Sequence, residues 1–149
     1  MIENLFSLKG RVALVTGGSR GIGKMIAQGF VESGSKVYIS ARKADACDAT
    51  AAELSKFGEC ISLPQDISTV AGAKALAEQI YKLEGKLDIL VNNAGAAWAA
   101  DFDEFPEHGW DKVMNLNVKS PFFLTQALHA ALKKAASADK PAKVINICS

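Results

Sequence analysis

Short apolar segments alternate with longer segments of helical periodicity along the whole chain. Runs of apolar and β-branched residues bounded by turn residues are typical of buried parallel strands. They occur at 11–15, 36–41, 60–64, 87–91 and 143–148. Helical spacing of apolar residues predicts helices at 21–33, 45–57, 70–84, from about 106, and from 115 to about 136. The alternation predicts an α/β fold with one doubly wound, parallel Rossmann sheet of about five strands in the order 3-2-1-4-5.

The first strand–turn–helix unit carries the clearest chemical signal. Its turn reads Thr16-Gly17-Gly18-Ser19-Arg20-Gly21-Ile22-Gly23, and Gly34 is placed to end the helix. Apolar spacing predicts a buried helical face formed by Ile22, Met25, Ile26, Gly29 and Phe30. A helix N-terminus leaves amide groups unpaired and carries partial positive charge. Because Gly17, Gly21 and Gly23 have no Cβ, a diphosphate can approach these amides closely. The alternative is a glycine-rich turn without a ligand.

The end of the second predicted strand indicates which dinucleotide would bind. An acidic residue here would bind the ribose 2′-hydroxyl of NAD. The sequence has Ser40-Ala41-Arg42-Lys43 instead, and no carboxylate precedes Asp45. Arg42, with Arg20 from the glycine turn, matches the geometry of a 2′-phosphate, and Ser40 could add a hydroxyl. We therefore expect NADP(H) in preference to NAD(H). The alternative is that Arg42 and Lys43 are solvated turn residues.

Composition narrows the classes of partner. The 149 residues suit one domain, 49% of them are hydrophobic, and the formal net charge is +1. We expect no nucleic-acid partner, because no basic stripe is present. We expect no membrane partner, because no apolar run approaches about 20 residues and the N-terminus lacks a secretory pattern. Cys47, Cys60 and Cys148 form no C-x-x-C pair. They indicate reduced thiols in a cytoplasmic protein and no metal site.

Two motifs resemble the short-chain dehydrogenase/reductase family. One is Thr16-Gly17-x-x-x-Gly21-x-Gly23, and the other is Asn92-Asn93-Ala94-Gly95 after the fourth predicted strand. Segments 6–23 and 109–114 are similar to the bacterial 3-oxoacyl reductases of this family. The resemblance covers the whole chain and implies cofactor-binding roles for twelve residues, namely Gly17, Ser19, Arg20, Gly21, Ile22, Gly23, Arg42, Asp66, Ile67, Asn93, Ala94 and Gly95.

Some of these residues have specific roles in the family. By position, Asp66 would bond the adenine amino group, while Asn93 would bond backbone across the sheet or contact the cofactor ribose. Ser68 or Thr69 could cap the next helix. The family's catalytic Asn, held at a local helix irregularity, matches Asn117, with Asn115 as the fallback. The family's catalytic Ser matches Ser149.

The family's catalytic Tyr and Lys form a Tyr-x-x-x-Lys motif further along the domain, and the chain stops before it. We therefore expect residues 1–149 to be an incomplete dinucleotide-binding domain, a fragment that turns over negligibly by itself. Without its usual neighbour, strand 143–148 would be an exposed apolar sheet edge. Leu5, Phe6 and Leu8 are expected to pack against the first strand. Trp98, Phe102 and Phe105 either line a substrate mouth or close over the core.

For the complete enzyme, the resemblance implies NADPH-dependent hydride transfer to a small-molecule carbonyl substrate, with a 3-oxoacyl compound favoured. It also implies a homodimer or homotetramer, because the long helix that begins at Asn115 often forms a dimer face in the family. Two alternatives stay open. One is a polyol or sugar dehydrogenase of the same family, and the other is a dinucleotide-binding fragment without catalysis that acts as a sensor or partner subunit.

Overall fold

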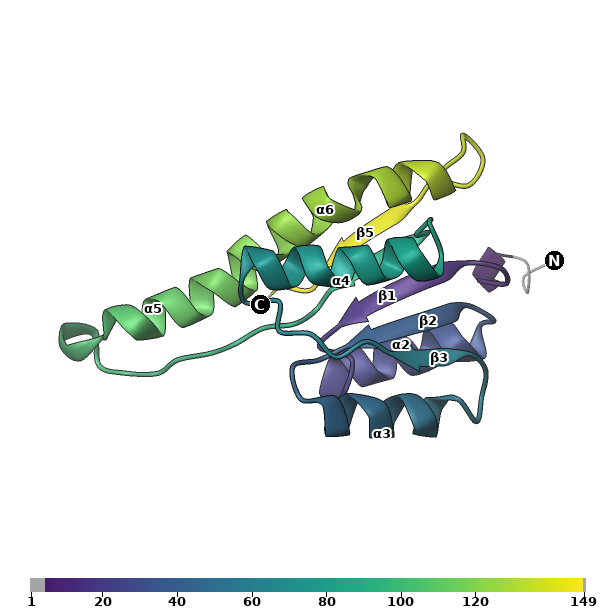
Figure 1. The fold of residues 1–149 in the computed structure, drawn as a ribbon. Coiled ribbons are helices and arrows are strands. Elements are labelled where there is room, and N and C mark those ends of the chain that lie inside the picture. Colours follow the sequence, from purple (N-terminus) through teal and green to yellow (C-terminus); the bar gives the residue numbers. More distant parts are fainter. Residues whose placement is uncertain (1–4, 149) are drawn as a thin grey trace.

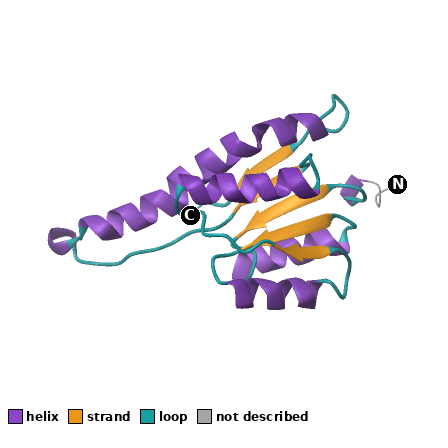
Figure 2. Ribbon diagram, in the orientation of Figure 1, coloured by secondary structure: helices purple, strands orange, loops and turns teal. Residues whose placement is uncertain are grey.

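The computed structural model describes residues 5–148, which form one parallel sheet with helices on both faces (Figures 1 and 2). The strand order is β3-β2-β1-β4-β5, so the predicted order 3-2-1-4-5 is confirmed. All pairs are parallel, and β1 pairs with β2 and β4 on its two sides. The strands are β1 (Val12–Thr16), β2 (Lys36–Ser40), β3 (Cys60–Ser62), β4 (Ile89–Asn92) and β5 (Lys143–Asn146).

Two hydrophobic cores lie on opposite faces of the sheet. Helices α2 (Gly21–Glu32) and α3 (Ala44–Leu54) cover one face, while α4 (Val70–Leu83) and α6 (Ser120–Ala135) cover the other (Figure 1). Successive strand residues point to opposite faces. Ala13 and Val15 therefore join the core under α2 and α3, and Leu14 joins the core under α4 and α6.

The buried face of α2 agrees only in part with the predicted one, because Ile26 and Phe30 pack against the core as expected. Ile22 and Met25 are 56% and 64% exposed, whereas Gly23, Ala27 and Val31 are buried. Small residues face the sheet because α2 lies too close to β1 and to the glycine turn for large side chains. The prediction that Ile22 and Met25 are buried, which rested on their apolar spacing, is therefore wrong. Gly34, at φ +91°, follows the helix as expected.

Several element ends also differ from expectation. Helix α3 ends at Leu54 rather than Phe57, and at its end the Ser55 hydroxyl lies 2.7 Å from the Ala51 carbonyl oxygen and 2.9 Å from that of Cys60, to which its one proton is available. On α4, Leu83 is exposed, although it follows the buried Leu76 and Ile80 at helical spacing. Strands β2, β3 and β5 end one or two residues earlier than predicted. Leu5 and Phe6 are exposed, so only Leu8 of the lead-in packs against the core.

Beyond β4 the chain leaves the sheet as a long loop and returns as a helical arm, residues 107–135 (Figure 1). The loop contains a short 3₁₀ turn, η1 (Phe102–Glu104), and leads to α5 (Glu107–Met114). A π-helical turn, η2 (Asn115–Lys119), joins α5 to α6. Between residues 5 and 148, no helix is both long and apolar enough to cross a membrane.

Strand β5 is one edge of this sheet. Val144, Ile145 and Ile147 are each at least 40% exposed, which matches the expected apolar edge.

Candidate functional site

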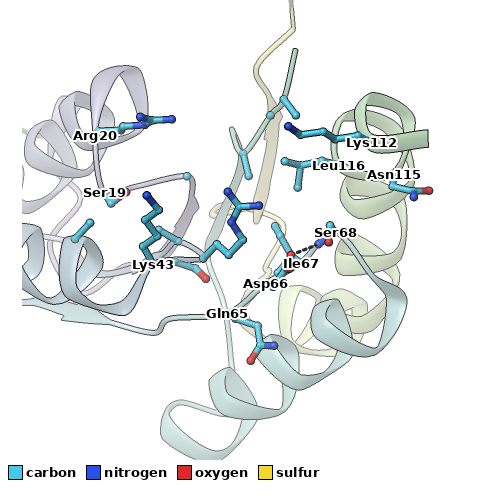
Figure 3. Close-up of a pocket in the computed structure, with 18 of the residues that line it drawn as sticks. Ser19, Arg20, Lys43, Gln65, Asp66, Ile67, Ser68, Lys112, Asn115 and Leu116 are labelled. Atoms are coloured by element: carbon cyan, nitrogen blue, oxygen red, sulfur yellow. Dashed lines mark hydrogen bonds between the residues drawn. The ribbon is translucent and has the colours of Figure 1, made fainter. Parts of the chain in front are cut away.

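A cavity of about 790 Å³ opens at the carboxyl ends of β1, β2 and β4. In Figure 3 Ser19 and Arg20 lie on one side of it, while Lys112, Asn115 and Leu116 lie on the opposite side. Its volume is in the range of small-molecule and cofactor sites. Eight of the twelve predicted cofactor residues line it, namely Gly17, Ser19, Arg20, Arg42, Asp66, Ile67, Ala94 and Gly95.

The glycine turn is compact because side chains are missing where backbone segments meet. Gly17 and Gly21 have φ of +64° and +56°, which L-residues with side chains rarely adopt. A Cβ on Gly23 would overlap the carbonyl oxygen of Gly17 and lie 2.5 Å from Nδ2 of Asn93. Ile22 and Gly23 belong both to the glycine turn and to the first helical turn of α2. They do not line the cavity.

Asn93 and Thr16 tie the ends of β4 and β1 together behind the turn. Asn93 Nδ2 donates to the carbonyls of Thr16 (3.1 Å) and Gly17 (3.3 Å). The Thr16 hydroxyl accepts from the amides of Asn93 and Ala94, both at 3.0 Å. Of the two roles expected for Asn93, the structure shows the backbone bonding across the sheet.

Positive charge gathers at the end of β2. Arg20 and Arg42 are exposed, and neither is in a salt bridge within residues 5–148. Their guanidinium groups are available to an anion. The Ser40 hydroxyl lies beside them, is buried, and has no hydrogen-bond partner in the described chain. An orphaned buried hydroxyl costs free energy unless a partner arrives.

Asp66 lines the cavity in the segment that follows β3. Its Oδ1 accepts from the Ser68 amide at 3.0 Å (dashed in Figure 3). This hydrogen bond, helped by the charge of Arg42, holds the pKa of Asp66 below its ordinary value. Asp66 is therefore an ionised acceptor at neutral pH. The Thr69 hydroxyl accepts from the Gly72 amide, so Thr69, rather than Ser68, caps α4.

Asn117 lies in the π-helical turn η2, at the kind of helix irregularity expected for it. Its amide makes two hydrogen bonds to the backbone of Ala96, because Oδ1 accepts from Ala96 N (2.7 Å) and Nδ2 donates to Ala96 O (2.9 Å). This contact joins the loop after β4 to the helical arm. Asn115, the fallback, lines the cavity, whereas Asn117 does not. Ser149 lies outside the described residues.

The far wall contains residues that the sequence did not identify. Lys112 and Leu116 come from the helical arm, and Ala96 and Ala97 come from the loop. Trp98 packs on α5 beside Gly109, with the Lys112 ammonium 5.3 Å from its ring centroid and the His108 ring at 4.8 Å. Trp98 therefore holds the loop on the arm, while Phe102 is 94% exposed and covers no core.

Comparisons with known proteins agree with this geometry. The sequence profile described as "short chain dehydrogenase" matches residues 11–149. The chain belongs to this family. Membership of this family accounts for the glycine turn, the Asn-Asn-Ala-Gly segment and the strand order. The resemblance predicted from the sequence is confirmed.

The chain covers only part of the length of each relative. The chain is 56% identical over 144 residues to the rhamnolipids biosynthesis 3-oxoacyl-[acyl-carrier-protein] reductase of Pseudomonas aeruginosa, covering 97% of the chain and 56% of that protein. It is 38% identical to a 2-dehydro-3-deoxy-D-gluconate 5-dehydrogenase of Dickeya dadantii, covering 100% and 57%. The solved Pseudomonas aeruginosa RhlG/NADP active-site complex superposes with a TM-score of 0.94, covering 97% and 56%. The chain spans about half the length of these relatives.

Proposed function

We propose that the cavity binds NADP(H) and that the chain is the dinucleotide-binding part of an NADPH-dependent short chain reductase acting on a carbonyl substrate. The observation that carries the proposal is that the glycine turn and two arginines, which form no salt bridge within residues 5–148, line the same open cavity. The turn suits a diphosphate, and the arginines suit a further phosphate on the adenosine ribose. The Pseudomonas relative whose solved complex contains NADP shares 56% of the residues.

Each part of the cavity has a role in this proposal. The first amides of α2 and the backbone of the glycine turn hold the diphosphate. Arg20 and Arg42 hold the 2′-phosphate, and the ionised Asp66 accepts from the adenine amino group. Ile67, Ala94 and Gly95 supply small or apolar contacts along the floor. Asn93 acts behind the floor, where it fixes the turn through the carbonyls of Thr16 and Gly17.

Bound NADPH supplies a hydride to the carbonyl carbon of the substrate. In the family resemblance, Asn117 holds a water of the proton relay and Ser149 orients the carbonyl oxygen. In the structure the Asn117 side chain makes two hydrogen bonds to Ala96, and in the family resemblance it is the backbone of this residue that holds the water. The Ala96 contact also fixes the loop that forms the far wall of the cavity.

A 3-oxoacyl compound is the substrate class we propose, because the 56% identical Pseudomonas protein is a 3-oxoacyl-[acyl-carrier-protein] reductase. A sugar-acid substrate is the second candidate, supported by the 38% identical Dickeya dehydrogenase. As further parts of the proposal, the longer enzyme acts in the cytoplasm, consistent with three free thiols, as a homodimer or homotetramer. Trp110, Val118 and Phe122 give the helical arm the exposed apolar stripe that such a contact needs.

Calorimetric titration of the folded chain with NADP⁺ and NAD⁺ tests the cofactor. We expect NADP⁺ to bind more tightly, and failure of both nucleotides to bind at millimolar concentration would refute the proposal. To test the substrate class, the assay uses the whole gene product, including any sequence that follows Ser149. Its NADPH oxidation with a 3-oxoacyl thioester is compared with that for a keto-gluconate. Faster turnover of the keto-gluconate would transfer the assignment to the second candidate.

A further inference from the structure

A hydrogen bond from α3 anchors the glycine turn at its midpoint. Thr50 is 6% exposed, and its hydroxyl donates to the carbonyl oxygen of Ser19 at 2.8 Å. The two residues are 31 positions apart in the chain. Within residues 5–148, the structure gives the Ser19 carbonyl no second hydrogen-bond partner. The position of the Ser19–Arg20 peptide therefore depends on a residue that does not line the cavity.

The direction of this bond has a geometric consequence. A trans peptide is planar, so the carbonyl of Ser19 and the amide N–H of Arg20 point in opposite directions. With the carbonyl held toward α3, the Arg20 N–H points away from α3. Ser19 and Arg20 line the cavity, so this peptide forms part of its wall.

The neighbouring residues make such an anchor necessary. Gly17 and Gly21 flank the peptide, and glycine has many accessible backbone conformations. Before the Ser19–Arg20 peptide, the Gly18 amide donates to the Ser40 carbonyl at 3.1 Å, and this bond fixes the start of the glycine turn to β2. Without the Thr50 bond, the Ser19–Arg20 peptide could rotate between the two glycines.

We propose that Thr50 is a positioning residue that preorganises the Ser19–Arg20 peptide to bind the diphosphate of a nicotinamide dinucleotide. This inference rests on the proposed binding of NADP(H). Preorganisation improves affinity because the loop does not have to be ordered when the ligand binds. The diphosphate is common to NADP⁺ and NAD⁺, so loss of the anchor weakens the binding of both.

The test compares Thr50→Val, which removes the hydroxyl but keeps the shape, with Thr50→Ser, which keeps the hydroxyl. We expect T50V to weaken the binding of both NADP⁺ and NAD⁺ by about threefold to tenfold. T50S should stay within about twofold of wild type. The control is Glu53→Gln, because Glu53 bonds Lys24 of α2 at 2.7 Å from the same helix without touching the turn. It should leave both affinities unchanged.

Amide hydrogen exchange gives a readout that needs no ligand. Residues 17–24 of T50V should exchange faster than in wild type, while the strands keep their protection. If T50V does not fold, Thr50→Ala takes its place with the same expectations. Wild-type affinity and wild-type exchange in the folded variant would overturn the role of Thr50 and leave the cofactor proposal intact. A wild-type chain that binds neither nucleotide would instead refute the proposed function and, with it, this inference.

Discussion

Replacing Gly23 by alanine tests whether the close contact between α2 and the glycine turn organises the site. The new methyl group would lie 2.8 Å from the carbonyl carbon of Gly17 and 2.5 Å from Asn93 Nδ2. The second distance is 0.9 Å shorter than the 3.4 Å at which ordinary contact begins. Both neighbours belong to the hydrogen-bonded junction of β1 and β4, so the N-terminus of α2 must move instead.

Gly29 provides a matched control within the same helix. A Cβ on Gly29 would meet nothing within 4 Å, and the residue is exposed. Gly29→Ala should therefore show only the helix-propensity gain of alanine over glycine, about 0.5–1 kcal/mol of added stability. Gly23→Ala has at most the same gain in helix propensity. It also overpacks the contact with the glycine turn, which costs about 1–3 kcal/mol of stability. The difference in unfolding free energy between the variants measures the cost of the overlap.

Urea denaturation followed by circular dichroism measures this difference. With a slope of about 2 kcal/mol per molar urea, the two midpoints should differ by about 0.5–1.5 M. Calorimetry then gives the affinity for NADP⁺. We expect G29A to bind as wild type and G23A to bind about tenfold more weakly or worse, because displaced amides lose hydrogen bonds to a charged group.

Two results would contradict this reasoning. If G23A were as stable as G29A, α2 would not be held against the turn as the structure shows. If G23A were destabilised but bound NADP⁺ like wild type, the close contact would serve the fold alone. The amides at the start of α2 would then not be the diphosphate site.

Three further predictions concern single side chains. Arg42→Asp should remove a phosphate partner and shift the preference from NADP⁺ toward NAD⁺ in calorimetry, and unchanged NADP⁺ binding would exclude Arg42 from the site. Thr69→Ala should lower the unfolding free energy by about 1 kcal/mol in urea melts through loss of the α4 cap, whereas Thr69→Ser should not. Burial, and then its hydrogen bond to Glu84, raises the pKa of Tyr38 to about 12 from its ordinary 10. The folded state therefore retains a proton that the unfolded state loses, so stability should fall between pH 10 and pH 12. Tyr38→Phe should reduce that slope without removing it, because the pKa values of Lys36 and Cys60 are also raised in the folded state. An unchanged slope would assign it to those other groups.

The sequence predicted the centre of the sheet well because β1, β2 and β4 are buried on both faces. Val12–Val15 and Leu90–Val91 have no polar position that could report a solvent face, so the continuous apolar run identifies them directly. The helices were harder. On α2 the close approach to the sheet selects Gly23 and Ala27 for the buried face, and residues this small give little hydrophobic signal.

The site was predictable where one segment supplies several contacts. The glycine turn, Arg42 and Asp66 each follow a strand, and carboxyl ends of parallel strands meet at one edge of a sheet. Lys112 and Leu116 could not be found this way, because they reach the cavity from the helical arm. Their position depends on the loop after β4, which Asn117 and the packing of Trp98 on Gly109 hold to the arm.

The strand order explains why rigidity and specificity can reside in different residues here. From β1 the chain moves outward through β2 to β3, then returns to β4 on the other side of β1, so the cavity opens where the order reverses. At this point the Thr16 hydroxyl accepts from two amides of the β4 exit and donates to the Val91 carbonyl at 3.3 Å. The floor is therefore fixed by buried hydrogen bonds that no ligand needs to form. Arg20 and Arg42 are exposed on the rim, so under the proposed function replacing either charge should change the preference between NADP(H) and NAD(H) without disturbing the junction beneath it.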